Sequence, residues 1–220
     1  MRDAGRFLVL EGPDGVGKST QVALLAQWME ALGVPHLVTR EPGGTPLGEA
    51  IRSLVLERPD LDVPAESELL LILAARAAFV RDVVRPALAE GKTVVADRFS
   101  LSTLAYQGYG RGLDLSRVRA GIEIATGGLR PDLYVVLDLS EDEAWARRGR
   151  AGTEPDRIEA AGERFRRSVR EGYLALMESE LGVERVDARG TPEEVHERVR
   201  DRISARFPGT FNVTRAERDG

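Results

Sequence analysis

The chain has 220 residues, a formal net charge of −5 at pH 7 and no cysteine. A chain of this length fits one large domain or at most two small ones, and it can bury about 70% of its unfolded surface. The absence of cysteine excludes disulfides, thiolate metal sites and cysteine nucleophiles. The longest apolar run, Leu69–Ala75, is too short to cross a bilayer, and no signal-peptide pattern is evident. We expect a soluble, cytoplasmic protein, and the acidic balance argues against a general nucleic-acid binder.

Apolar runs alternate with helical periodicity along the chain. We expect strands at Arg6–Glu11, His36–Arg40, Thr93–Ala96, Leu133–Leu139 and Val183–Asp187. We expect helices at Lys18–Leu32, Pro46–Leu56 and Ala65–Ala89, and two more that begin with capping boxes at Ser140 and Thr191. Near-continuous apolar strands that alternate with helices predict an α/β fold with a five-stranded parallel sheet and helices on both faces. The pattern ends at Phe207, so we expect residues 207–220 to form a loose tail.

The segment Gly12-Pro13-Asp14-Gly15-Val16-Gly17-Lys18-Ser19 matches the phosphate-binding motif G-x-x-x-x-G-K-[ST]. It lies between the first strand and the first helix. Such a loop surrounds a polyphosphate with backbone N–H groups, and the following helix adds its positive N-terminal end. Lys18, one of only two lysines, is expected to reach the outer phosphates, and the Ser19 hydroxyl to coordinate Mg²⁺. The segment predicts binding of a nucleoside triphosphate with magnesium.

Three further clusters point to a second phosphorylated ligand. Asp97-Arg98 closes the third strand, where Arg98 can grip a phosphate and Asp97 can hold the magnesium hydration shell, or the two can form a plain ion pair. Arg40–Thr45 offers two glycines for close approach to a ligand, although an ordinary turn uses the same residues. The third cluster consists of the arginines at 147, 148 and 150 with Asp156-Arg157. It fits either a lid that closes over the transferring phosphoryl group or a solvated helix face.

No catalytic dyad or triad is evident, and this fits transfer to a phosphate rather than to an alcohol. A phosphate monoester is already mostly dianionic at neutral pH, so no base is needed to remove a proton. For a nucleoside monophosphate acceptor, positioning, Mg²⁺ and arginines suffice. The chain lacks the N-K-x-D motif that reads guanine, which argues against a GTPase switch, and it is too short for most motor ATPases.

Taken together and in order, these segments resemble bacterial thymidylate kinases from about Arg6 to Arg206. The matching stretches are Glu11–Gln21, Thr39–Thr45, Ala74–Arg76, Asp97-Arg98, Ser102–Gly108, Arg130–Asp132 and Asp156–Glu159. The resemblance implies a three-layer P-loop nucleoside monophosphate kinase fold, with one domain of residues 1–206 and a lid at about 147–157. It also implies transfer of the γ-phosphoryl group of ATP to dTMP, giving dTDP and ADP for dTTP synthesis. Mg²⁺ would be required, and the protein would be a homodimer without a nucleic-acid or membrane partner.

The resemblance assigns roles by position. ATP would be bound by residues 12–20, which extend the phosphate-binding loop to Thr20, and Mg²⁺ by Ser19 and Asp97, in part through water. Lys18, Arg98 and the lid arginines Arg147, Arg148 and Arg150 are the catalytic candidates. The dTMP site would be built from Asp14, Glu41, Pro42, Ile72, Arg76, Arg98, Thr103, Tyr106 and Gln107.

Within that site the resemblance gives several side chains a specific task. Arg98 would grip the dTMP phosphate with the help of Asp14, and Arg76 would hydrogen-bond the thymine edge. Thr103 and Gln107 would line the base pocket. Tyr106 would crowd the position of a 2′-hydroxyl and so favour deoxyribose, unless it is an ordinary packing residue.

The family has two groups that differ in the origin of the catalytic arginine. In one group the arginine directly follows the aspartate of the loop, and in the other it comes from the lid. Gly15 follows Asp14 here, so the chain resembles the second group. The spacing leaves open which of the three lid arginines acts.

The chain departs from the family pattern at Ile72, where a phenylalanine usually stacks on thymine. An aliphatic side chain keeps an apolar contact but loses stacking worth roughly 0.5–1.5 kcal/mol. Phe79 lies two helical turns further along the same face. It either fills part of the gap or packs in the core.

Two other functions stay open at this point. A related kinase that acts on deoxynucleosides or on another nucleoside monophosphate would transfer the phosphoryl group to a different acceptor. A nucleotide-binding regulator would have kept the fold and lost transfer. The intact Lys18, Ser19 and Arg98 count against the regulator.

Overall fold

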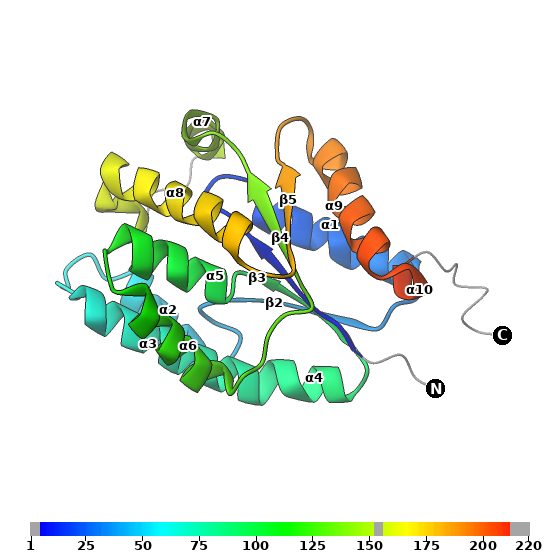
Figure 1. Cartoon of the computed structure of the whole chain (residues 1–220), viewed down its shortest axis with the longest axis horizontal. Coiled ribbons are helices and arrows are strands. Elements are labelled where there is room, and N and C mark those ends of the chain that lie inside the picture. Colours follow the sequence, from blue (N-terminus) through cyan, green and yellow to red (C-terminus); the bar gives the residue numbers. More distant parts are fainter. Residues whose placement is uncertain (1–4, 152–155, 212–220) are drawn as a thin grey trace.

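A five-stranded parallel sheet forms the centre of the computed structural model, which describes residues 5–151 and 156–211 (Figure 1). The strand order is β2-β3-β1-β4-β5, and all four pairings are parallel. The strands are β1 (Phe7–Glu11), β2 (His36–Arg40), β3 (Thr93–Asp97), β4 (Leu133–Asp138) and β5 (Val183–Asp187). The predicted sheet is confirmed, and the strand bounds agree with the sequence pattern to within one residue at each end.

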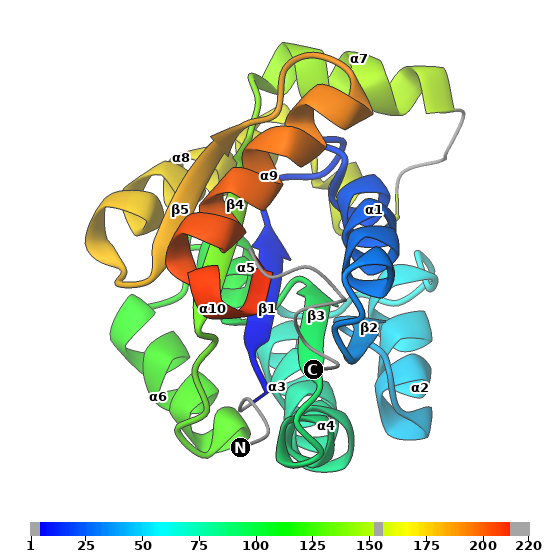
Figure 2. The same ribbon diagram turned by 90° about the vertical axis from the view of Figure 1, so that its right-hand side faces the viewer.

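Helices cover both faces of the sheet (Figure 2). They are α1 (Lys18–Ala31), α2 (Pro46–Leu56), α3 (Ala65–Phe79), α4 (Arg85–Ala89), α5 (Ser100–Thr103), α6 (Leu115–Thr126), α7 (Glu141–Ala151), α8 (Glu163–Ser179), α9 (Pro192–Arg206) and α10 (Pro208–Phe211). The predicted helix at 65–89 is present, but a π-helical segment, Val80–Val84, separates α3 from α4. Pro86 has no N–H to donate, and the wider turns lie directly before it.

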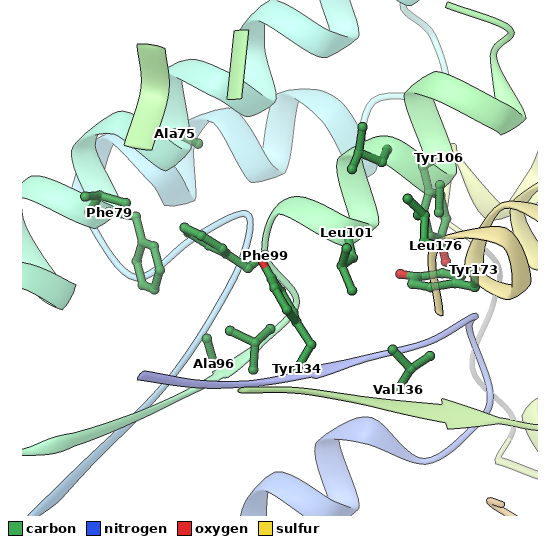
Figure 3. Packing of buried hydrophobic residues seen from close by; sticks show 14 of the residues in the cluster. Ala75, Phe79, Ala96, Phe99, Leu101, Tyr106, Tyr134, Val136, Tyr173 and Leu176 are labelled. Atoms are coloured by element: carbon green, nitrogen blue, oxygen red, sulfur yellow. The ribbon is translucent and has the colours of Figure 1, made fainter. Parts of the chain in front are cut away.

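Alternation along β1 sends its side chains into two separate cores. Phe7 and Val9 join the core under α2 to α6 and α8, whereas Leu8 and Leu10 join the core under α1, α9 and α10. Figure 3 shows part of the first core, in which aromatic rings lie between the sheet and the helices. Because the central strands are buried on both faces, they appear in the sequence as continuous apolar runs. Among the described residues, no helix has the length and apolar character to span a membrane.

Only one of the two predicted capping boxes is complete. At the start of α9, Glu194 N–H donates to Thr191 Oγ1 and Thr191 N–H donates to the Glu194 carboxylate. At the start of α7, Glu143 N–H lies 3.4 Å from Ser140 Oγ, but the Glu143 carboxylate accepts from the Ser140 hydroxyl. The glutamate therefore meets the side chain instead of the backbone N–H that a capping box requires.

The expectation of a loose tail from Phe207 is wrong for residues 207–211. These residues continue into α10, where Phe211 is 3% exposed and stacks on Trp28 of α1 with ring centroids 5.1 Å apart. The guanidinium of Arg6 lies 5.2 Å from the centre of the Phe207 ring. A four-residue helix is too short to show periodicity, so the sequence pattern could not reveal it. Residues 212–220 lie outside the described part of the chain.

Replacing Phe211 by alanine is expected to lower the free energy of unfolding by about 1.5–3 kcal/mol, because a fully buried ring is lost. Chemical denaturation measures this change. The matched control is Arg202→Ala on the exposed side of α9, where the change is expected to stay within about 0.5 kcal/mol. If α10 contributed nothing to the fold, the two variants would have equal stability.

Candidate active site

A cleft of about 730 Å³ lies at the carboxyl ends of the strands and brings most of the predicted residues together. It is the position at which open α/β sheets bind ligands. The predicted residues that line it are 14–20, Glu41, Pro42, Ile72, Arg76, Asp97, Arg98, Thr103, Tyr106, Gln107, Arg147 and Arg148. Gly12 and Pro13 do not line it. The side chain of Arg150 lies outside the described part of the structure.

The loop between β1 and α1 is shaped by close backbone contacts. Gly12 has a φ of +133°, and a Cβ there would lie 2.4 Å from the Leu137 carbonyl oxygen of β4. Lys18 Nζ donates to the carbonyl oxygens of Gly12 at 3.0 Å and Pro13 at 2.7 Å. Gly12 and Pro13 therefore hold the side chain of Lys18, which lines the cleft.

Helix α7 rests directly on this loop at Gly15. A Cβ at Gly15, whose φ is +81°, would lie 2.3 Å from the carbonyl oxygen of Ala144 in α7. Any side chain at this position would push α7 away. An arginine at position 15 would therefore clash with α7 in its present position. This contact gives a physical reason for glycine in a chain with arginines on α7.

Burial and the neighbouring Arg98 lower the pKa of Lys18 from 10.5 to about 8. The Nζ group is charged below this pKa and loses its charge above it. We therefore expect kcat/KM for ATP, which reports on the free enzyme, to fall by about tenfold per pH unit above pH 8. A steady-state pH profile measures this, and a flat profile up to pH 9.5 would contradict the assignment of Lys18 to the phosphates.

Arg98 adopts a backbone conformation with φ of +76°, which non-glycine residues rarely occupy and which costs about 1–3 kcal/mol. The conformation turns its side chain toward the phosphate-binding loop. Its guanidinium pairs with Asp14 and donates to the Gly12 carbonyl oxygen at 3.1 Å. It also donates to the hydroxyls of Tyr106 and Tyr173. The arginine is thus tied to the loop while part of its side chain faces the cleft.

Asp14 is held as a carboxylate. Burial raises its pKa, but Arg98, Lys18 and the hydrogen bond from the Tyr106 hydroxyl outweigh burial, so the pKa lies below its ordinary value. The Tyr106 hydroxyl donates to Asp14 Oδ2 at 2.6 Å. Burial raises the pKa of Tyr106 well above its usual value, so this donor keeps its proton at neutral pH.

Behind Arg98 lies a buried carboxylate, Glu11, to which the sequence pattern gave no role. Its oxygens accept from the backbone N–H groups of Phe99 at 2.8 Å and Ser102 at 3.1 Å. They also accept from the hydroxyls of Ser102 at 2.6 Å and Tyr173 at 2.8 Å. Both hydroxyls in turn contact the Arg98 guanidinium. A single charged residue at the end of a buried apolar strand was a signal for this role, whereas nothing in the sequence pointed to Tyr173.

At the other end of the cleft, Arg76 is 2% exposed and fixed by three acceptors. Its N–H groups donate to Glu41 Oε2 at 2.8 Å, Thr103 Oγ1 at 2.8 Å and the Phe99 carbonyl oxygen at 3.0 Å. Burial raises the pKa of Glu41 despite the neighbouring Arg76. A guanidinium has five N–H bonds, and Arg76 Nη2 also lies 2.7 Å from Glu41 Oε2, so one N–H on Nη1 remains for a ligand in the cleft.

Phe79 does not compensate for Ile72. Ile72 lines the cleft, whereas Phe79 is fully buried in the core, with its ring centroid 6.5 Å from that of Phe99 (Figure 3). Two turns of helix bring residues to one face but separate them by about 10 Å along the axis. The hypothesis that Phe79 fills part of the stacking position is therefore wrong.

Two oxygen groups meet beneath the phosphate-binding loop in a way that suits magnesium. The Ser19 hydroxyl donates to Asp97 Oδ2 at 2.8 Å. Mg²⁺ prefers oxygen ligands and is usually held by one or two protein groups together with phosphates and water. Among the described residues, no group of three or more His, Cys, Asp or Glu side chains could hold a metal alone. The pair fits an ion that is shared with a nucleotide.

Helix α7 carries the three arginines of the predicted lid. Arg147 donates to the Gly190 carbonyl oxygen at 3.1 Å, and both Arg147 and Arg148 line the cleft. Arg148 is close enough to Asp14 to help lower the pKa of that carboxyl. The cleft is also lined by three residues that were not predicted, namely Gly190, Pro192 and Val195. Residues that contribute only backbone or apolar contacts form no recognisable sequence motif. Residues 152–155 of the predicted lid lie outside the described part of the chain.

A phosphate-binding loop that shares one cleft with Arg98 and Arg76, on a parallel sheet with this strand order, is typical of P-loop kinases. Comparison with known proteins makes the class more specific. The model of the thymidylate kinase family matches residues 10–199. The thymidylate kinase of Synechococcus sp. strain RCC307 is 49% identical over 201 residues, which cover 89% of this chain and 93% of the relative.

Other relatives agree. The thymidylate kinase of Chlorobium luteolum is 46% identical and covers 91% of this chain and 98% of its own length. A crystal structure of thymidylate kinase from Ehrlichia chaffeensis superposes with a TM-score of 0.73 at 30% identity, covering 91% of this chain and 99% of that one. The chain belongs to the thymidylate kinase family. It is a phosphotransferase with ATP as donor and dTMP as acceptor, and the comparisons do not support the other two functions.

Proposed function

We propose that the described cleft holds ATP and dTMP together, with the two phosphate ends facing each other across Arg98. Residues 12–20 would bind the ATP phosphates. Arg98 would bind the dTMP phosphate, and Ile72, Arg76, Thr103 and Gln107 would surround the base, with Glu41 and Pro42 beside them. The observation that carries this proposal is that Arg98, the arginine aimed at the acceptor, is paired with Asp14 of the donor loop.

The transfer needs no protein base. The attacking oxygen belongs to a phosphate that is already ionised at neutral pH. Lys18 and the lid arginines would neutralise the charge that spreads over the transferring phosphoryl group. Ser19 and Asp97 would hold Mg²⁺, which supplies charge neutralisation between the donor phosphates. The lid, at about 147–157, would exclude water and so prevent hydrolysis of ATP.

Tyr106 supports the preference for deoxyribose. Its hydroxyl donates to Asp14, and the Arg98 guanidinium carbon lies 5.0 Å from its ring centre. A ring fixed by these contacts cannot move aside for an added oxygen. The same contacts keep Tyr106 beside Arg98, which would bind the dTMP phosphate, and the deoxyribose would lie next to that phosphate.

The proposal extends to a homodimer in the cytoplasm. Exposed apolar side chains lie on the neighbouring helices α2, α3 and α6, with Leu47 53%, Leu70 66% and Ile124 85% exposed. A second copy would remove this apolar surface from water. Light scattering coupled to gel filtration measures the mass, and a particle of 24.1 kDa would contradict the dimer.

A screen of acceptors tests the function. The chain is incubated with ATP, Mg²⁺ and each of dTMP, dUMP, dCMP, dAMP, dGMP, UMP and thymidine, and ADP release is measured. ADP release is expected to be fastest with dTMP and much slower with UMP. Transfer to thymidine but not to dTMP would overturn the proposal, as would ADP release that does not depend on an acceptor.

A further inference from the structure

A buried carboxylate outside the cleft, Glu68 of α3, collects donors from three parts of the chain. Its side chain is 0% exposed. It accepts from Arg111 Nε at 3.1 Å and Nη2 at 3.0 Å, and from Arg157 Nη2 at 2.5 Å. It also accepts from Gln107 Nε2 at 3.0 Å. None of the roles derived above uses this cluster, although Gln107 lines the cleft.

The charge state of Glu68 is fixed by these partners. Burial raises its pKa, but the hydrogen bonds and charges of Arg111, Gln107 and Arg157 outweigh burial, so its pKa is lowered. An ionised carboxylate has no proton to donate and can only accept. The atom of Gln107 that faces Glu68 must therefore be the NH₂ group.

This constraint sets the polarity of Gln107 toward the cleft. The amide has an NH₂ end with two N–H bonds and a carbonyl end, and the NH₂ end lies against Glu68, to which it donates one hydrogen bond. Among the hydrogen bonds of the described residues, the Gln107 side chain makes the one from Nε2 to Glu68, and its Oε1 accepts none. The carbonyl end is therefore the end that Gln107 can present to a ligand, while Arg76 beside it offers only donors.

An acceptor next to a donor matches only some base edges. Thymine has an N3–H donor beside the O4 acceptor, whereas cytosine has an N3 acceptor beside the N4 amino donor. A site that presents an acceptor and a donor pairs with thymine and leaves two mismatched pairs with cytosine. Buried polar groups that lose their partners cost far more than a lost contact, which makes this arrangement selective.

We propose that Glu68 is a positioning residue for base selection: by holding the amide of Gln107 with its carbonyl toward the cleft, it makes the site accept thymine and reject cytosine. The inference rests on the proposed placement of the dTMP base beside Gln107. Glu68 does not touch the nucleotide and acts only through the orientation of Gln107.

Glu68→Gln tests the proposal with almost no change in shape. The side chains of Arg111 and Arg157 can only donate hydrogen bonds. They therefore bind the one oxygen that the glutamine side chain at position 68 retains. The new NH₂ group then faces Gln107, whose amide turns over and presents a donor to the cleft. We expect kcat/KM for dTMP to fall and the ratio of kcat/KM for dTMP to that for dCMP to fall by about tenfold or more. Most of the loss is expected in KM, because the reacting phosphates are untouched.

A double-mutant cycle separates orientation from general damage. In the Gln107→Ala background, the further change Glu68→Gln is expected to leave the dTMP/dCMP ratio unchanged, because the group it acts through is absent. Arg111→Lys is the matched control, since it keeps a positive charge beside Glu68, disturbs the paired hydrogen bonds and leaves the bond between Glu68 and Gln107. Its melting temperature is expected to fall while its ratio stays that of the unmodified chain.

The outcomes distinguish this inference from the function on which it rests. If the unmodified chain phosphorylates dTMP and folded Glu68→Gln keeps the same dTMP/dCMP ratio, the positioning role is wrong and the kinase function stands. If Arg111→Lys lowers the ratio as much as Glu68→Gln does, the cluster acts through stability and the inference also fails. If the unmodified chain does not act on dTMP, the proposed function itself fails.

Discussion

Replacing Arg148 by alanine is expected to lower kcat by about 10³-fold, as for other arginines that neutralise a transferring phosphoryl group. Three lid arginines were candidates, and the structure separates two of them. The Arg147 guanidinium is held by the Gly190 carbonyl oxygen, to which it donates a hydrogen bond. Arg148 lines the cleft near enough to Asp14 to influence the pKa of that carboxyl, and Asp14 is paired with the Arg98 that would hold the acceptor. Arg148 therefore lies nearer to the point of transfer.

Steady-state kinetics with saturating ATP and dTMP measures the effect. Arg147→Ala is the matched control, and its main effect is expected on KM for ATP. Arg148→Lys keeps the charge without the planar fork and is expected to recover only part of the rate. If Arg148→Ala stays within a few-fold of the unmodified chain and Arg150→Ala shows the large loss, the assignment passes to Arg150.

The sheet could be predicted from the sequence because its strands are buried on both faces. β1 and β4 are continuous apolar runs, and the loop motif after β1 fixes where the chain turns into α1. The segment after Arg98 could not be predicted in the same way. Its short helix α5 continues into a π-helical stretch, Leu104–Gly110, whose wider turns shift the apolar pattern away from helical periodicity.

The residues of the candidate site likewise fall into those with a local sequence signal and those without one. Lys18, Arg98 and Arg76 could be found because their positions follow from a motif, a strand end or a family pattern. Glu11 and Glu68 could not be assigned roles, because their partners come from distant positions such as Tyr173 and Arg157. Pairings across 162 and 89 positions are set by the packing of helices on the sheet, and a single sequence holds no local signal for them.

Replacing Lys18 by methionine is expected to lower kcat/KM for ATP by on the order of 10³-fold or more, because the donor phosphates lose the charge that faces them. Methionine keeps most of the aliphatic stem and removes only the ammonium. The Lys18 side chain is 7% exposed, and the pKa of its ammonium is lowered to about 8 because burial and Arg98 disfavour the charge. Below pH 8 the folded chain therefore holds a charge that would be more stable in water.

The two readouts of this variant are expected to move in opposite directions. Activity falls, while the free energy of unfolding at pH 7 stays equal or rises, since the unfavourable burial of a charge is relieved. Coupled ADP-release kinetics and urea denaturation measure them on the same preparation. Lys92→Met changes the other lysine, whose side chain is exposed, and should leave both activity and stability unchanged. A loss of activity that is accompanied by a matching loss of stability would mean that Lys18 mainly holds the loop through the Gly12 and Pro13 carbonyl oxygens, and that the phosphates are bound by backbone N–H groups alone.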